Sequence, residues 1–386
     1  MATSNDALLD LLVKKGILTE AEAGSVAAEL EEEKNEAKQE DKGISFSAKG
    51  KETVKLRFNG RLHYQYDSLD ADYNGADQAS TNHFYFRRLR LGAKATHQSG
   101  VFAQMVFDMA EDDFAIDTAI AGYEFNDYLT GIVGYQKVPF GFEETTSSNS
   151  IKTVERSAAN RFIVDDLDFA ARHSGLHAEG KLGAGFSYGA AVVNGVQGEG
   201  SKLMGETNAS NDLGVFGSIR WEGNGLTLGA DAGHKSNQEL VDDSDSYQDV
   251  TAFTAYAHYN ISGFDVSGEY FHADLDDLED FNGYALRLAY QMGKFEPVVR
   301  YSYGKSDAFE IDVDELIRRA PGPGAAPNDR NPDSGDNEIE SYYVGLNYYY
   351  NKAVSLMLGY EIADAEDDTG YDVDVDGFRA RLKLLW

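Results

Sequence analysis

The 386-residue chain contains no cysteine, which excludes disulfide bonds, thiolate metal sites and a cysteine nucleophile. Proline is scarce, with 6 residues in the whole chain. Positive charge is also in short supply, because 34 Lys and Arg face 66 Asp and Glu and leave a formal net charge of -32. Phosphate backbones are bound by Lys and Arg, so this balance argues against a nucleic-acid partner.

Long apolar runs are absent too. No stretch of the sequence approaches the roughly 18 to 20 apolar residues of a membrane-spanning helix, which excludes a helical membrane protein. A membrane-spanning β-barrel stays open, because its strands alternate apolar and polar residues and carry a much weaker hydropathy signal.

The chain is rich in residues typical of strands and turns, with 39 Gly, 23 Tyr and 21 Phe. From about Thr53 onward, apolar and polar residues alternate with a period of two, which indicates strands. In "VKLRFNGRLHYQY", from Val54 to Tyr66, the apolar side chains share one face and the polar ones share the other. The same alternation runs through "YYVGLNYYY" and the final "FRARLKLLW". About sixteen such segments are present.

The connections between these segments alternate between short and long. Short turns are expected at residues 97–100, 125–128, 180–184, 222–225, 260–263, 291–294 and 350–353. Long polar loops are expected near residues 67–83, 139–166, 195–211, 236–247, 273–281, 304–338 and 363–374, with one brief connection near 111–113. Tight turns at one end and long loops at the other are typical of a transmembrane barrel. The sheet must close into a ring because lipid offers no hydrogen-bond partner to the backbone groups of an open edge.

We therefore predict an all-β fold: a sixteen-stranded antiparallel transmembrane β-barrel over residues 50–386, preceded by a short N-terminal helical segment. An even strand number places both ends of the barrel on the periplasmic side. Residues 1–42 form the second unit, with a Leu-rich helix from Asn5, a capping box at Thr19 and Glu22, and a charged stalk from Glu31. This head is either a coiled-coil trimerisation element, a contact with a periplasmic or peptidoglycan layer, or a frayed acidic tail.

The stretch "FRRLRLGAKA", residues 86–95, has basic side chains on one face and apolar side chains on the other. Arg88, Arg90 and Lys94 fall on one face of the strand, whereas Leu89 and Leu91 fall on the other. We expect the leucines to face lipid and the cations to face water inside a pore, since about sixteen strands enclose an aqueous channel. Barrel closure brings the first and last strands together. The predicted pore-lining basic residues are Arg57, Arg61, Arg88, Arg90, Lys94, Arg287, Arg300, Arg379 and Arg381.

The segments "FNGRLHYQY", "FYFRRLRLGAKA", "VGYQKVPFGFEE", "VERSAANRF" and "GLNYYYNKAVSLMLGY…RARLKLLW" resemble the phosphate-selective porin O and P family of Gram-negative outer membranes. The likeness covers roughly residues 50–386. The resemblance implies a homotrimer of sixteen-stranded barrels in the bacterial outer membrane, in contact with outer-membrane lipid and lipopolysaccharide. It also implies a pore narrowed by the third extracellular loop, here between Val138 and Leu167, and an N-terminal segment in the periplasm.

The expected function is a passive channel for small hydrophilic solutes, with a preference for small anions such as phosphate. The constriction loop mixes both signs of charge, in Lys152, Glu155, Arg156, Arg161, Asp165 and Asp166. The outer loops are strongly acidic, and acidic groups repel phosphate within about a Debye length, near 8 Å. Three alternatives follow: a weakly cation-selective general porin, a structural tether acting through the N-terminal head, and basic residues neutralised by lumen acids such as Asp231 and Glu269.

Several motifs point to other chemistry, and none of them favours an enzyme. "GFSYG" around Ser187 has the nucleophile-elbow pattern but lies within an alternating strand rather than a strand-turn-helix. His173 and His177 are too far apart along a strand for a metal site. "DVDVDG", from Asp372, opens like a calcium loop but has Lys383 at its twelfth position. We expect no cofactor, apart from weak surface Ca²⁺ at the acidic outer loops, and we expect a β-bulge near Gly377.

Overall fold

The computed structural model describes residues 46–47, 54–73, 77–110, 114–195, 212–239, 247–275, 280–306, 313–320, 337–367 and 370–386. The predicted helical head, residues 1–42, lies outside these residues, so its conformation and its role stay predictions. Within the described residues, no helix is long and apolar enough to cross a membrane.

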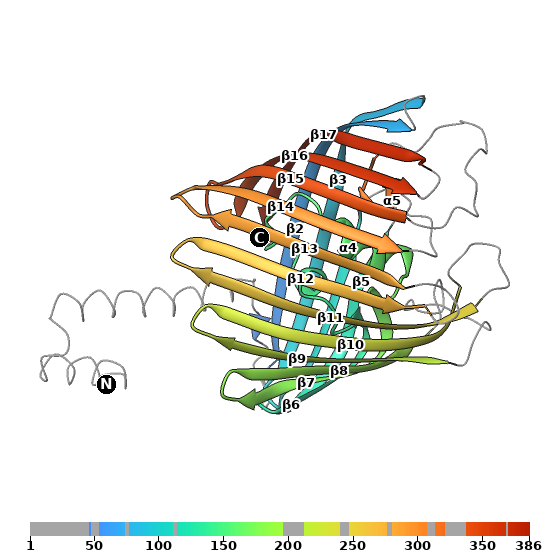
Figure 1. Cartoon of the computed structure of the whole chain (residues 1–386). Helices are drawn as coiled ribbons and strands as arrows, with labels where there is room; N and C mark the ends of the chain where they lie inside the picture. Colours follow the sequence, from blue (N-terminus) through green and yellow to red (C-terminus); the bar gives the residue numbers. More distant parts are fainter. Residues whose placement is uncertain are drawn as a thin grey trace, which may run out of the picture.

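Sixteen antiparallel strands form a closed barrel (Figure 1). They are β2 (Val54–Tyr73), β3 (Asp77–His97), β4 (Val101–Asp108), β5 (Ala115–Asn126), β6 (Leu129–Lys137), β7 (Arg172–Gly183), β8 (Phe186–Asn194), β9 (Leu213–Gly223), β10 (Leu226–Glu239), β11 (Tyr247–Ile261), β12 (Phe264–Asp274), β13 (Phe281–Tyr290), β14 (Phe295–Ser306), β15 (Asn337–Tyr349), β16 (Val354–Asp367) and β17 (Asp372–Leu385). Each strand pairs with its neighbour in sequence, and β17 pairs with β2 to close the ring. The two-residue strand β1 (Phe46–Ser47) pairs with β2 beside Lys55 and Leu56. The predicted barrel and its strand number are confirmed.

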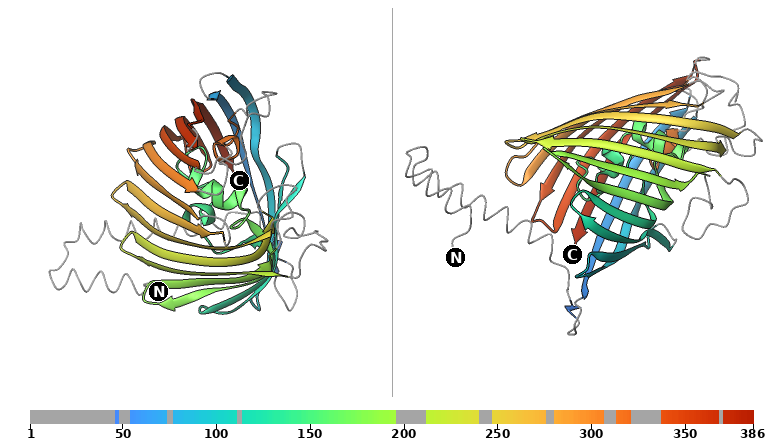
Figure 2. Two further views of the ribbon diagram at one scale, coloured as in Figure 1. Left: turned by 45° about the vertical axis from the view of Figure 1, so that its right-hand side comes forward. Right: turned by 90° about the horizontal axis from the view of Figure 1, so that it is seen from below.

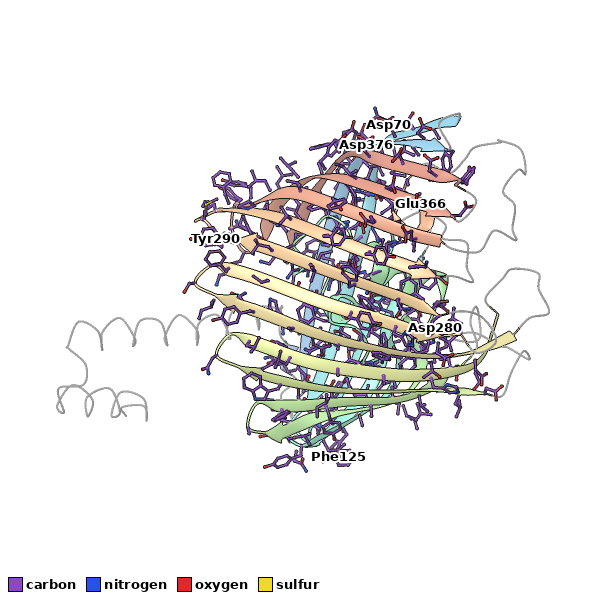
Figure 3. The ribbon with its side chains drawn as sticks, in the orientation of Figure 1. Asp70, Phe125, Asp280, Tyr290, Glu366 and Asp376 are labelled. Carbon is purple, nitrogen blue, oxygen red and sulfur yellow. The ribbon has the colours of Figure 1, made fainter. Side chains whose placement is uncertain are left out.

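One end of the barrel carries only tight turns, at the sites that the sequence predicts. Three of these turns contain two consecutive residues with positive φ, the geometry of the hairpin turn that matches the twist of the strands. Asn224 and Gly225, for example, have φ of 52° and 76°. Tyr290 and the C-terminus lie at this short-turn end, whereas Asp280 and Glu366 lie at the opposite, long-loop end (Figures 1 and 3).

Two predicted loops are shorter than expected. Strands β2 and β3 continue through most of residues 67–83, and β16 and β17 run through most of 363–374. The predicted β-bulge near Gly377 is also wrong, since β17 keeps a continuous register with both neighbours. Val373 and Val375 point inward and are buried, because the barrel interior is apolar at this level rather than water-filled. The alternation of β17 is therefore continuous, and its inward side chains change from apolar Val373 and Val375 to basic Arg379 and Arg381 along the strand.

The outer surface of the barrel is apolar and carries two aromatic belts. At the short-turn end, the outward aromatic residues include Phe125, Tyr128, Phe186, Tyr259, Phe264, Tyr290 and Phe295. Toward the long-loop end they include Tyr64, Phe84, Phe86, Phe253, Tyr270, Tyr342, Tyr360 and Phe378. Exposed Leu91, Leu176 and Val344 lie on the surface between them. This is the pattern of a barrel that spans a lipid bilayer.

The main core of the described residues lies inside the barrel. It joins inward side chains of the strands to two segments that fold into the lumen (Figure 2). The first, loop L3 (residues 138–171), connects β6 to β7 and contains α3 (Phe142–Thr145), α4 (Ala158–Arg161) and the π-helical turn η1 (Phe162–Asp166). The second, loop L7, connects β14 to β15 and contains α5 (Val313–Leu316) within its described part, residues 313–320.

Candidate functional site: the constricted lumen

Loop L3 is anchored at its start by two carboxylates of the barrel wall. Asp231 of β10 accepts a hydrogen bond from the Gly141 amide at 2.9 Å. Glu269 of β12 accepts from the amides of Phe142 at 2.6 Å and Glu143 at 2.9 Å. The sequence suggested these two acids as partners of lumen arginines, but in the structure they receive the first, otherwise unpaired amides of α3.

Farther along, L3 lies flat against strands β14, β15 and β17. Lys152 forms an ion pair with Glu296 at 2.7 Å, and the Lys152 carbonyl accepts from Asn347 at 2.8 Å. Ser302 of β14 accepts a hydrogen bond from the Ala159 amide at 3.2 Å. Because these contacts together hold both backbone and side-chain groups of L3, the loop is fixed against the wall on this side of the lumen.

Glu155 is the central charge of L3. Its carboxylate pairs with Arg87 of β3 at 2.9 Å and with Arg381 of β17 at 2.5 Å, and its carbonyl accepts from Arg300 at 2.8 Å. Burial raises the pKa of the Glu155 carboxyl, but Arg87 and Arg381 outweigh it and hold that pKa well below its usual range. Glu155 is therefore ionised at neutral pH and ties L3 to strands on both sides of the barrel seam.

A second carboxylate of L3, Glu144, is held in the same way. It pairs with Lys137 of β6 and, at 3.3 Å, with Arg156 of L3. Burial raises the pKa of Glu144, and Arg156 and Lys137 more than reverse this, so the pKa lies below its usual range. Arg156 also donates to three carbonyls of the same loop, which fixes its guanidinium at the loop surface.

Open space remains on the other side of L3. A cavity of about 920 Å³ lies between L3 and the wall formed by β2 to β7. Nine basic residues line it: Arg61, Arg87, Arg88, Arg90, Lys137, Arg156, Arg161, Arg172 and Arg318. Five acidic residues line it: Asp117, Glu144, Glu155, Asp165 and Asp168. Among the described residues, nine positive against five negative charges leave the cavity wall with an excess of four, in a chain whose total is strongly negative.

Most of these cations are paired with acids. Asp117 binds Arg90 at 2.6 Å and Arg172 at 2.8 Å, so two cations share one carboxylate. Arg61 is different, because it donates to the neutral Ser148 hydroxyl at 2.8 Å and the described residues offer it no ion pair. Arg88 lies 4.0 Å from the nearest oxygen of Asp108, a carboxylate that Arg90 already binds at 2.6 Å.

These two arginines lie close together on the wall. Register places Arg61 opposite Arg90 and His63 opposite Arg88, across the β2–β3 pair. Two guanidinium groups whose donors are not saturated by protein carboxylates therefore line the cavity on this wall. Guanidinium groups of this kind bind oxyanions.

The remaining predicted basic residues have other surroundings. Arg287 pairs with Asp265 at 2.5 Å, and Arg300 pairs with Glu361 at 2.5 Å. Arg379 and Arg381 are almost wholly buried and bind Glu361 and Glu155. None of these four lines the 920 Å³ cavity. Each of the four is paired with a carboxylate, which is the arrangement that the neutralising alternative describes, with Asp265, Glu361 and Glu155 as the partners in place of Asp231 and Glu269.

Arg57 and Lys94 lie opposite each other in the β2–β3 ladder, nearer the short-turn end. The Lys94 ammonium lies 4.8 Å above the Phe102 ring. Of the predicted L3 residues, Glu155, Arg156, Arg161 and Asp165 line the cavity, whereas Lys152 anchors the loop. Asp166 ends η1, and its side chain lies outside the described part of the structure.

Sequence reasoning missed Arg87, which lines the cavity next to Arg88. The register between β2 and β3 shifts between His63 and Tyr64, so that β3 has one extra residue there. The signal was present: outward Phe84 and Phe86 are even-numbered, whereas outward Leu89 and Leu91 are odd-numbered. A change of parity within one strand requires a bulge, and this one turns Arg87 inward.

The other motifs behave as strand residues. Ser187 lies within β8, and the "DVDVDG" stretch is the start of β17 rather than a loop. His173 is fully buried, and one of its ring nitrogens lies 3.3 Å from the Phe169 carbonyl at the end of L3. Among the described residues there is no cluster of His, Asp and Glu able to hold a metal ion.

A closed barrel with an apolar belt outside, a polar cavity inside and an inward-folded loop defines a porin. The chain belongs to the phosphate-selective porin O and P family, whose model matches residues 56–254 and 237–386. It is 22% identical to a monosaccharide porin of a Halomonas species, over 97% of this chain and 100% of that protein. It is 23% identical to porin O of Pseudomonas aeruginosa, over 89% of this chain and 91% of that protein.

Solved structures show the same fold. OmpT, an outer membrane protein of Vibrio cholerae in a trimer form, superposes with a TM-score of 0.56 at 13% identity, covering 86% of this chain and 99% of that chain. Membership of this porin family makes the protein a passive channel of the bacterial outer membrane.

Proposed function

We propose that the channel prefers small anions, phosphate among them, and that the cavity between L3 and strands β2 to β7 is the anion path. The observation that carries this proposal is the excess of positive charge on the cavity wall, together with the incompletely neutralised Arg61 and Arg88. Walls of charge bias which ions pass a pore, and charge inside a narrow cavity acts on every solute that crosses it.

Neutral polar groups also line the cavity, among them Asn59, Gln104, Gln136, Asn149 and Asn160. Amide groups hydrogen-bond hydroxyl groups as readily as phosphate oxygens. Passage of monosaccharides, for which one relative is named, is therefore compatible with the same cavity. A solute with both a hydroxylated body and a negative charge would use both kinds of group.

The orientation and assembly are proposals of the same kind. Long loops would face the outside and short turns the periplasm, with residues 1–42 beside the short-turn end. A homotrimer in lipopolysaccharide-containing membrane is supported by the trimer form of the Vibrio cholerae neighbour. A tether to the periplasmic layer remains the alternative role of residues 1–42.

Replacement of Arg61 and Arg88 by glutamine tests the anion path. A unit charge at 8 Å in water contributes about 0.5 kcal/mol, or roughly a factor of two in local anion concentration. Each charge also lowers the local cation concentration by the same factor, so loss of both charges is expected to lower the ratio of chloride to potassium permeability about sixteenfold. The measurement is the reversal potential of single channels under a KCl gradient.

The matched control is Arg220→Gln. Arg220 is a lumen arginine of β9 that donates to Tyr256 at 3.1 Å and does not line the cavity. Its replacement should leave the reversal potential within the scatter of the unmodified protein. Equal shifts in the control and the double variant would contradict the assignment of the path, because any lumen charge would then serve.

A further inference from the structure

Loop L7 carries a short helix into the barrel and packs it onto L3. Val313, Leu316 and Ile317 are almost fully buried in the core that also contains Phe162 and Ile163 of η1. In Figure 1, α5 lies near the long-loop ends of β15 and β16. The apolar side of α5 thus covers the L3 turn from the long-loop side of the lumen.

The chain just after α5 is fixed to strands β17 and β3 of the barrel wall. The Arg318 carbonyl accepts a hydrogen bond from Arg379 of β17 at 2.9 Å, and the Arg319 carbonyl accepts from Thr81 of β3 at 3.1 Å. Arg319 has φ of 64°, in the left-handed region that non-glycine residues rarely adopt. Two wall contacts and a sharp turn therefore determine where the adjacent side chains point.

The two neighbouring arginines point to different places. The Arg319 guanidinium lies 5.0 Å above the Tyr85 ring, and Arg319 is exposed and does not line the cavity. Arg318 lines the cavity. Glu155 and Arg161 of L3 line the same cavity, and the Arg318 carbonyl is held by Arg379, which places Arg318 beside the constriction.

We propose that L7 is a second selectivity element and that Arg318 is its working residue. Arg318 supplies a cation at the long-loop entrance of the cavity, before Arg88 and Arg61 on the wall. An anion arriving through the acidic outer end then meets positive charge before it reaches L3. This inference deepens the proposed anion path and rests on it.

The absence of cysteine makes a direct test available. A single Arg318→Cys variant is reconstituted in planar bilayers and treated with an anionic or a cationic methanethiosulfonate reagent. The anionic reagent replaces one positive by one negative charge, a change of two units, and should lower anion permeability about fourfold relative to the unmodified protein. The cationic reagent restores the positive charge and should return the permeability ratio to within about twofold of that of the unmodified protein.

The matched control is Arg319→Cys, in which the same reagents place the same charges one residue farther along the chain. Its modification should change the permeability ratio by less than the scatter between channels. Arg318→Lys keeps the charge and should keep the selectivity, and heat-modifiable migration on gels shows whether each variant forms a folded barrel. The inference would be overturned if the folded Arg318→Cys channel had the same permeability ratio after either reagent. Equal responses of the Arg318→Cys and Arg319→Cys channels would also overturn it.

The outcomes separate the inference from the proposed function. If the unmodified channel does not prefer anions, the proposed function fails. A charge-dependent current at position 318 and not at 319 would still place Arg318 in the conduction path. If the unmodified channel prefers anions and position 318 does not respond, the anion path stands and the role of L7 fails.

Discussion

At the scale of single residues, the lumen contains two populations of arginine. Arg379 and Arg300 share the Glu361 carboxylate at 2.7 and 2.5 Å beneath L3 and L7, and all three are nearly inaccessible. Arg61 and Arg88 line the open cavity, and protein carboxylates neutralise their charges less completely. Buried pairs hold structure, whereas partly satisfied cations at a cavity act on solutes.

Replacement of Arg379 by leucine should destabilise the barrel without reporting on selectivity. It leaves Glu361 with one partner and removes the charge 3.4 Å from the buried Asp67. Breaking a buried pair from one side costs about 3 to 5 kcal/mol. The temperature at which the folded band disappears in heat-modifiability gels should fall. Lys181→Gln, on an exposed residue of β7, is the control and should not shift it.

The predicted basic residues that line the cavity are those whose position follows from alternation. Arg61, Arg88 and Arg90 face inward because their apolar neighbours face lipid. Arg87 was missed because one extra residue in β3 changes the parity, and Arg318 because it lies in an irregular loop. Which inward arginines are neutralised depends on partners from distant strands, such as Glu361, and no local pattern encodes those distances.

At the scale of elements, L3 decides the shape of the pore. Its position inside the barrel was implied by family resemblance, not by the periodicity of residues 138–171. The physical basis is visible only in three dimensions. An apolar face of α4 and η1 meets apolar side chains of the wall, and wall carboxylates receive the first amides of α3.

Replacement of Glu269 by alanine tests how L3 is anchored. It removes the acceptor for the Phe142 and Glu143 amides, and a buried donor left unpaired costs about 1 to 3 kcal/mol. The first turn of L3 should loosen, so open-channel current noise should rise and mean conductance should increase. Glu179→Ala, on an exposed carboxylate of β7, is the control. Unchanged noise in the Glu269 variant would contradict an anchoring role.

At the scale of the whole molecule, acidic and basic side chains occupy different regions. Cross-strand register aligns Asp72, Asp374, Asp364 and Glu340 in one row near the long-loop end, and brings Asp70 opposite Asp376 (Figure 3). These acids lie on the outward face of the barrel, because Val373, Val375 and Ile339 between them point inward. The cavity wall is positive instead. Salt screens charge over about 8 Å, so the outward acids act on solutes outside the barrel and the cavity charges act on solutes inside it. We therefore expect selectivity to follow the charge of the cavity wall rather than the net charge of the chain.

The most direct test of the anion path is the reversal potential of the purified channel in a planar bilayer under a KCl gradient, repeated with phosphate as the anion. The charge excess of the cavity predicts a potential on the anion side, and chloride current that falls when phosphate is added. A potential near zero or on the cation side would contradict it, and the acidic outer end would then be the dominant field.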